Sequence, residues 1–128
     1  MGKNKFGEGA EIVWQDRKRF MGLPLSFTRY SLVRNGVAWF KLFSNVGLFY
    51  SVIDEINLYR VYDITLSQSL ADKIFGTGTI TLFTSDKRAP SLSLTRIKHP
   101  YQVRDMLSQY IEEQRKLHKV AVAEFQRW

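Results

Sequence analysis

The chain has 128 residues, of which 45% are hydrophobic and 14% aromatic, a composition that excludes a disordered chain and suffices for one domain with a hydrophobic core. It contains no cysteine, which excludes disulfides and thiolate metal sites, and no apolar run of about 18 residues that would cross a membrane as a helix. Its formal net charge of +7 favours a polyanionic partner such as nucleic acid, anionic lipid or an acidic protein, or serves solubility alone.

The first ten residues hold three glycines and little apolar content, which predicts a flexible lead-in over residues 1–10. They lack the apolar segment of a secretory signal, so we expect a cytoplasmic protein, with attachment to the inner face of the membrane left open. A first strand is predicted at Ile12 to Phe20, with Ile12 and Trp14 on one side and Arg17 and Arg19 on the other. A turn at Met21 to Pro24 follows, because Pro24 cannot donate a ladder hydrogen bond.

The clearest local pattern is a β-hairpin. Phe27 to Arg34 and Val37 to Phe43 are runs of β-branched and aromatic residues joined by Asn35–Gly36. Asn-Gly suits the two left-handed positions of a type I′ turn, so these residues predict a hairpin with a two-residue turn. A third strand of the same meander is predicted at Leu48 to Ile53.

The middle of the chain predicts three further strands. Ile56 to Ser67 reads as a strand whose alternation breaks near Arg60, which predicts a bulge there. Ser69 to Phe75 is long enough for only one or two helical turns. The next strand is predicted at Thr79 to Thr84, with Ile80 and Leu82 on its buried side, and the last at Ser91 to Ile97.

After Pro100 the apolar period changes from two residues to three or four, which predicts an amphipathic helix. Its apolar positions are Val103, Met106, Leu107, Tyr110, Ile111 and Leu117. About seven strands followed by one helix is typical of an antiparallel barrel or sandwich with a C-terminal helix. We expect one domain over residues 11–117, followed by a helical extension over residues 118–128.

The order and spacing of several segments resemble the bacterial pleckstrin-homology (PH)-like family: Trp14 to Phe20, Gly22 to Tyr30, Leu58 to Ile64, Phe75 to Leu82, Thr84 to Asp86 and Ile97 to Pro100. The resemblance covers residues 11–116. It implies a PH-like barrel of about seven antiparallel strands in two orthogonal sheets, capped by a C-terminal α-helix. It also implies a binding or scaffolding module without catalytic activity or cofactor.

A basic cluster is the first candidate site. Arg17 and Arg19 share one side of the first predicted strand, next to Lys18, and Arg29 lies on the following strand. Their side chains either converge on a phosphate, carboxylate or lipid surface, or form an ordinary solvated strand face. In PH domains that bind phosphoinositides a further arginine completes the basic pattern. Ser31 occupies its position here, so that pattern is incomplete.

Two apolar segments have more than one interpretation. Met21, Leu23 and Leu25 form a loop that either touches a membrane beside the arginines or closes one end of the core. Leu117, Phe125 and Trp128 mark an interaction tail that accompanies several basic residues. For the tail, self-association is the leading interpretation, membrane contact and fraying the others.

The remaining chemical motifs predict no reaction. Gly76–Thr79 lacks the lysine of a phosphate-binding loop and precedes a strand, so we interpret it as a turn. His99 and His118 have no acidic residue at ligand spacing, which argues against a metal site. Asp54 and Glu55 point to opposite sides of a strand, a poor acid–base pair. We therefore expect no enzyme, no cofactor and no small-molecule substrate.

The leading functional interpretation is a protein-interaction or scaffolding module that acts through a protein partner or self-association. The alternative is a peripheral membrane module that binds anionic lipid through its basic surface. Nucleic-acid binding is disfavoured, because the aromatic residues that a stacking platform needs occupy alternating, buried strand positions.

Overall fold

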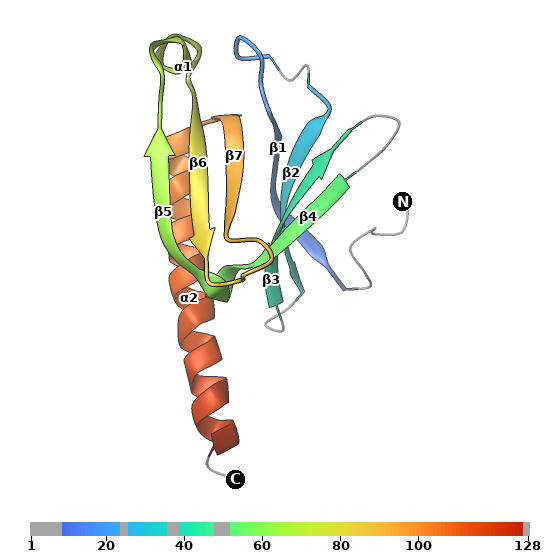
Figure 1. Cartoon of the computed structure of the whole chain (residues 1–128), viewed down its shortest axis with the longest axis vertical. Helices are drawn as coiled ribbons and strands as arrows, with labels where there is room; N and C mark the ends of the chain where they lie inside the picture. The colour runs from blue at the N-terminus through green and yellow to red at the C-terminus, as the bar shows by residue number, and fades with distance from the viewer. Residues whose placement is uncertain (1–8, 24–25, 36–38, 48–51, 127–128) are drawn as a thin grey trace.

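The computed structural model describes residues 9–23, 26–35, 39–47 and 52–126. In chain order the described elements are β1 (Glu11–Arg17), β2 (Thr28–Asn35), β3 (Trp39–Val46), β4 (Val52–Asn57), the short 3₁₀-helix η1 (Leu58–Arg60), β5 (Val61–Ser67), α1 (Leu70–Phe75), β6 (Thr77–Thr84), β7 (Ser91–Lys98) and α2 (Pro100–Gln126). The strands form two antiparallel sheets, ordered β1-β2-β3-β4 and β5-β6-β7, and α2 lies beside the second sheet (Figure 1). The predicted fold, two antiparallel sheets with a C-terminal helix, is confirmed.

The chain passes from one sheet to the other at η1. Leu58 is fully buried there while Arg60 is exposed, and β5 begins directly afterwards in the second sheet. The single strand predicted at Ile56 to Ser67 is therefore wrong: the alternation breaks because the chain changes sheets. The bulge predicted near Arg60 has its counterpart directly afterwards, where the register of β5 shifts between Val61 and Asp63.

The predicted hairpin is confirmed, but not its two-residue turn. Asn35 is paired with Trp39, so three residues separate the strands, and these lie outside the described residues. The third strand of the meander, predicted at Leu48 to Ile53, is present as β4 at Val52 and Ile53 and continues to Asn57; residues 48–51 lie outside the described residues. The first strand was predicted too long, because β1 ends at Arg17.

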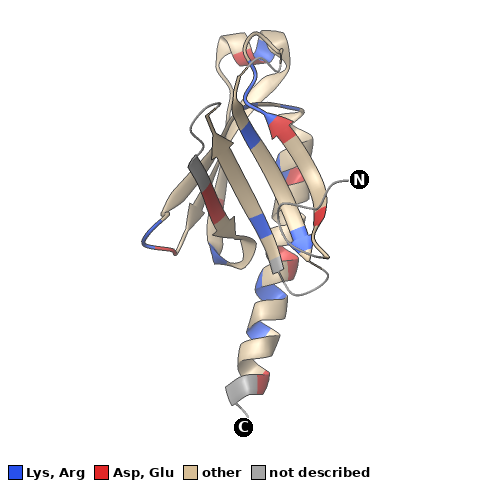
Figure 2. Ribbon diagram, turned by 90° about the vertical axis from the view of Figure 1, so that its right-hand side faces the viewer, with Lys and Arg blue, Asp and Glu red and all other residues tan. Residues whose placement is uncertain are grey.

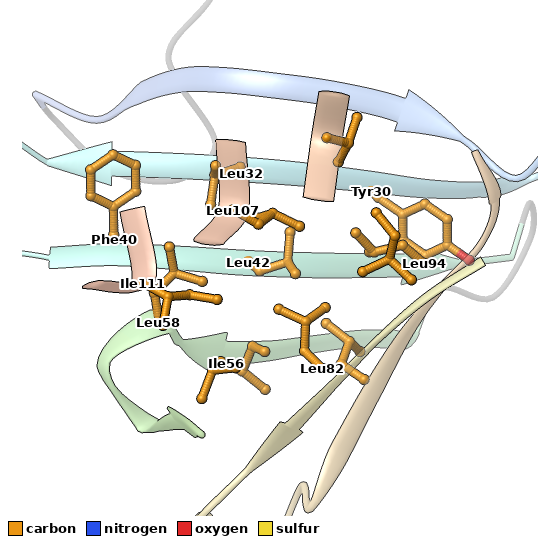
Figure 3. Packing of buried hydrophobic residues seen from close by; sticks show 14 of the residues in the cluster. Tyr30, Leu32, Phe40, Leu42, Ile56, Leu58, Leu82, Leu94, Leu107 and Ile111 are labelled. Carbon is orange, nitrogen blue, oxygen red and sulfur yellow. The ribbon is translucent and has the colours of Figure 1, made fainter. Parts of the chain in front are cut away.

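The core lies between the two sheets and α2. Figure 3 shows how side chains of β2, β3 and β4 meet those of β6, β7 and α2; the fully buried ones include Leu32, Leu42, Leu82, Leu94 and Leu107. The Tyr30 hydroxyl also bridges the sheets, since it accepts the Thr95 N–H at 3.0 Å. In the described residues no ladder joins β1 to β7 or β4 to β5, so the sheets pack face to face without closing into a continuous barrel.

Helix α2 continues past the sheets. Pro100 occupies its first turn, where a fixed φ and a missing N–H are tolerated, and Val103, Leu107 and Ile111 turn into the core. The C-terminal part of the helix projects past both sheets (Figure 1). Its residues from 115 to 124 are all exposed. No helix in the described part of the chain is both long and apolar enough to span a membrane.

Candidate functional site

The β1–β2 connection and α1 lie at the same end of the molecule, opposite the projecting end of α2 (Figure 1). Phe20 and Leu23 exchange two backbone hydrogen bonds of 2.9 Å, which closes a tight turn. Met21 and Gly22 form the turn with positive φ values of 52° and 82°, a conformation that glycine adopts without strain. An added Cβ at Gly22 would lie 3.4 Å from the Phe75 carbonyl oxygen, so the turn packs against the end of α1.

Helix α1 is short and is held by its caps. Ser69 and Asp72 form a reciprocal capping box, which satisfies two N–H groups of the first turn. The buried Asp72 carboxylate also accepts the Thr77 hydroxyl at 2.8 Å. Burial acts to raise the pKa of Asp72, but these hydrogen bonds outweigh it and lower that pKa below its ordinary value. Gly76 ends the helix in the left-handed conformation. The turn predicted at Gly76–Thr79 is correct only at Gly76, because β6 already begins at Thr77.

Asp16 anchors the β1–β2 connection to the second sheet. Its Oδ1 accepts hydrogen bonds from Arg19 Nε at 3.2 Å and Nη2 at 3.0 Å, and from the Arg17 N–H at 2.8 Å. Its Oδ2 accepts the Lys98 N–H at 2.9 Å, across 82 positions of sequence. The Lys98 ammonium in turn donates to the Phe75 carbonyl at the end of α1. Asp16 and Lys98 thus fix the turn and α1 to each other.

Large apolar side chains at this end are exposed rather than packed on the core. Phe20, Met21, Leu23 and Phe27 from the β1–β2 connection are each more than half exposed, and Leu70 and Ile74 of α1 are 78% and 70% exposed. We call these six residues the apolar tip. Met21 and Leu23 therefore do not close the core, and Leu25 lies outside the described residues. Apolar side chains gathered at one end of a surface mark a contact with another molecule or a membrane.

The predicted basic cluster lies directly behind the apolar tip. Arg17 and Arg29 are cross-strand partners on β1 and β2, and they line an open hollow of about 420 Å³ together with Gln15, Asp16 and Arg19. Lys18 follows at the end of β1, where its N–H donates to the Thr28 carbonyl. Figure 2 shows Lys and Arg residues, in blue, on the segments at this end of the molecule.

The four cations of this cluster are not equivalent. Arg19 is engaged by Asp16, and its Nη1 donates to the Gly22 carbonyl at 3.2 Å, so it supports the turn. The guanidinium groups of Arg17 and Arg29 have no hydrogen bond or ion pair within the described residues. Two unpaired cations opposite each other in a ladder repel one another, and a bound anion would relieve that repulsion.

The predicted interaction tail lies on the projecting part of α2. Leu117, Val120 and Val122 are 49%, 56% and 41% exposed. The side chain of Phe125 and all of Trp128 lie outside the described residues. Sequence reasoning missed one contact here: the His118 ring stacks on Tyr59 with centroids 4.1 Å apart, which holds the start of the projection against η1.

The described residues contain no group of three acidic or histidine side chains that could hold a metal ion. A family model described as "Bacterial PH domain" matches residues 22–111, which is more than half of the chain. Comparison with curated proteins and with solved structures gave no match. The matched range leaves out β1, with Arg17 and Asp16, and the projecting part of α2.

Proposed function

The chain belongs to the bacterial PH domain family, and we propose that it is a non-catalytic module that docks its α1 end onto an anionic membrane surface. The observation that carries this proposal is the apolar tip: six large exposed side chains from two separate segments project at one end. Arg17 and Arg29 lie immediately behind them.

This combination matches the two layers of a bilayer surface. Apolar side chains gain free energy where they enter the acyl boundary, and cations gain it among anionic headgroups. Because the turn and α1 are tied together through Asp16 and Lys98, both segments reach the surface in one fixed orientation. Little conformational entropy is then lost on docking.

The charge contribution is tested by Arg17→Gln/Arg29→Gln. Each cation near an anionic surface contributes about 1 kcal/mol, so the double variant should bind vesicles with phosphatidylglycerol about 30-fold more weakly. Co-sedimentation against lipid concentration measures this. The matched control is Lys87→Gln/Arg88→Gln, which removes the same charge from exposed positions in the β6–β7 turn. Equal losses in both variants would contradict docking by the α1 end.

A second function is supported by the projecting part of α2: self-association, as in a scaffolding module. Val103, Leu107 and Ile111 cover the core, and the same helical stripe continues through Leu117 and Val122, within the part of α2 whose residues from 115 to 124 are all exposed. An apolar stripe that leaves its own domain is suited to pack against the same stripe of a second copy.

Truncation after Lys116 tests this second function. If the projecting helix forms the contact, light scattering should give a mass about half that of the full chain at the same concentration. Val122→Glu is the matched point variant, since Val122 lies on this stripe and is 41% exposed, so its replacement leaves the core untouched. A full chain that is already monomeric, or an unchanged mass in both variants, would rule out self-association through α2.

A further inference from the structure

Strand β5 has a free edge. In the described residues its only ladder partner is β6, and its other side lies at the outer margin of the second sheet (Figure 1). Every second residue of an edge strand directs its N–H and C=O away from the sheet. Ile64 is such a residue, because its N–H donates to the carboxylate of the adjacent Asp63 at 2.9 Å.

A groove runs between this edge and α2. It has a volume of about 400 Å³ and is lined by residues 61–64 of β5 and by Ser108, Gln109, Ile111, Glu112 and Arg115 of α2. Tyr62 is 64% exposed, while Ile64 packs against the core. A strand added to β5 would place alternate side chains on the α2 side of the sheet, and therefore in this groove.

The groove differs in charge from the rest of the chain. Asp63 and Glu112 are both exposed, and neither forms an ion pair within the described residues. Arg115 is the one cation in the lining, so carboxylates prevail here on a chain of net charge +7. A basic side chain is attracted to this groove and an acidic one is repelled.

We propose that this groove binds an extended peptide segment that carries a lysine or arginine. A backbone carbonyl of the segment accepts the Ile64 N–H in place of the Asp63 carboxylate. The released carboxylate then binds the basic side chain together with Glu112. The groove and the apolar tip share no residue, so the two contacts are independent.

The test uses a defined probe, a seven-residue capped peptide of alternating threonine and valine with lysine at its centre. In an NMR titration of the full chain without lipid, we expect shift changes at the amides of Tyr62, Ile64 and Glu112. A peptide with glutamate at its centre should bind about tenfold more weakly, because two attractions become repulsions.

Two variants of exposed residues locate the contact. Glu112→Gln should weaken binding of the lysine peptide about threefold, whereas Glu113→Gln on the neighbouring face of α2 should leave it unchanged. Their unperturbed spectra without peptide will show that both variants are folded. The proposal is overturned by absent shifts on β5 at millimolar peptide, or by equal binding of the two peptides. It is also overturned by concentration-dependent shifts on β5 without peptide, which would assign the edge to a second copy.

Discussion

Replacing Asp16 with alanine is expected to lower the free energy of unfolding by about 3 kcal/mol, with a fall in Tm of about 10 °C. The carboxylate is only 10% exposed and makes the ion pair with Arg19. It also accepts the N–H of Lys98, the last residue of β7. Its loss leaves Nε and Nη2 of Arg19 and the Lys98 N–H without their acceptor in a partly buried place, which costs more than the hydrogen bonds contribute.

Two companion variants separate this network from a general charge effect. Asp54→Ala removes an equal charge from an exposed position on β4 and should change stability by less than about 0.5 kcal/mol. Asp16→Asn retains one carbonyl acceptor and should fall between the two. Urea unfolding followed by fluorescence measures all three. A loss for Asp16→Ala no larger than that of Asp54→Ala would mean that the network does not hold the two sheets together.

The elements of the fold could be predicted from local periodicity, but the connections between them could not. Local periodicity was enough for β6, where Ile80 and Leu82 are fully buried as predicted, and for α2 from Pro100 onward. It failed at Leu58 to Arg60. There a change of sheet and a bulge interrupt the alternation in the same way, and only the partners of the following strand distinguish them.

The candidate site was predictable in its residue types but not in its geometry. Alternation along a strand predicted that Arg17 and Arg19 share one face. However, β1 ends at Arg17, so alternation no longer determines the direction of the Arg19 side chain. The Arg19 guanidinium instead forms an ion pair with Asp16. The true neighbour of Arg17 is Arg29, its partner in the ladder. The capping box of Ser69 and Asp72 could be recognised in the sequence and was missed.

Exposure of the β1–β2 turn could not be derived from local sequence at all. Met21 and Leu23 are apolar whether they cover the core or project from it. The deciding contacts come from Phe75 and Lys98, which lie far along the chain and hold the turn beside α1. A residue's environment therefore depended on long-range contacts in the place where the proposed function lies.

Replacing Met21 and Leu23 gives the largest effect that we expect on membrane binding. Insertion of a Met or Leu side chain contributes about 1.5 kcal/mol when burial is partial, so Met21→Ser/Leu23→Ser should weaken vesicle binding about 100-fold. Both residues are more than half exposed in the free protein, so stability should change little. Vesicle co-sedimentation combined with thermal unfolding measures both quantities.

The control for this variant is Ile12→Ser/Val120→Ser, which removes two apolar side chains of similar exposure away from the apolar tip. It should bind vesicles like the unmodified chain. Salt separates the two contributions to docking, because added salt screens the arginines but not apolar insertion. The serine variant should therefore lose its remaining binding in high salt, while Arg17→Gln/Arg29→Gln should retain most of what it has. If both variants respond to salt alike, the apolar tip does not enter the bilayer and the attraction is electrostatic alone.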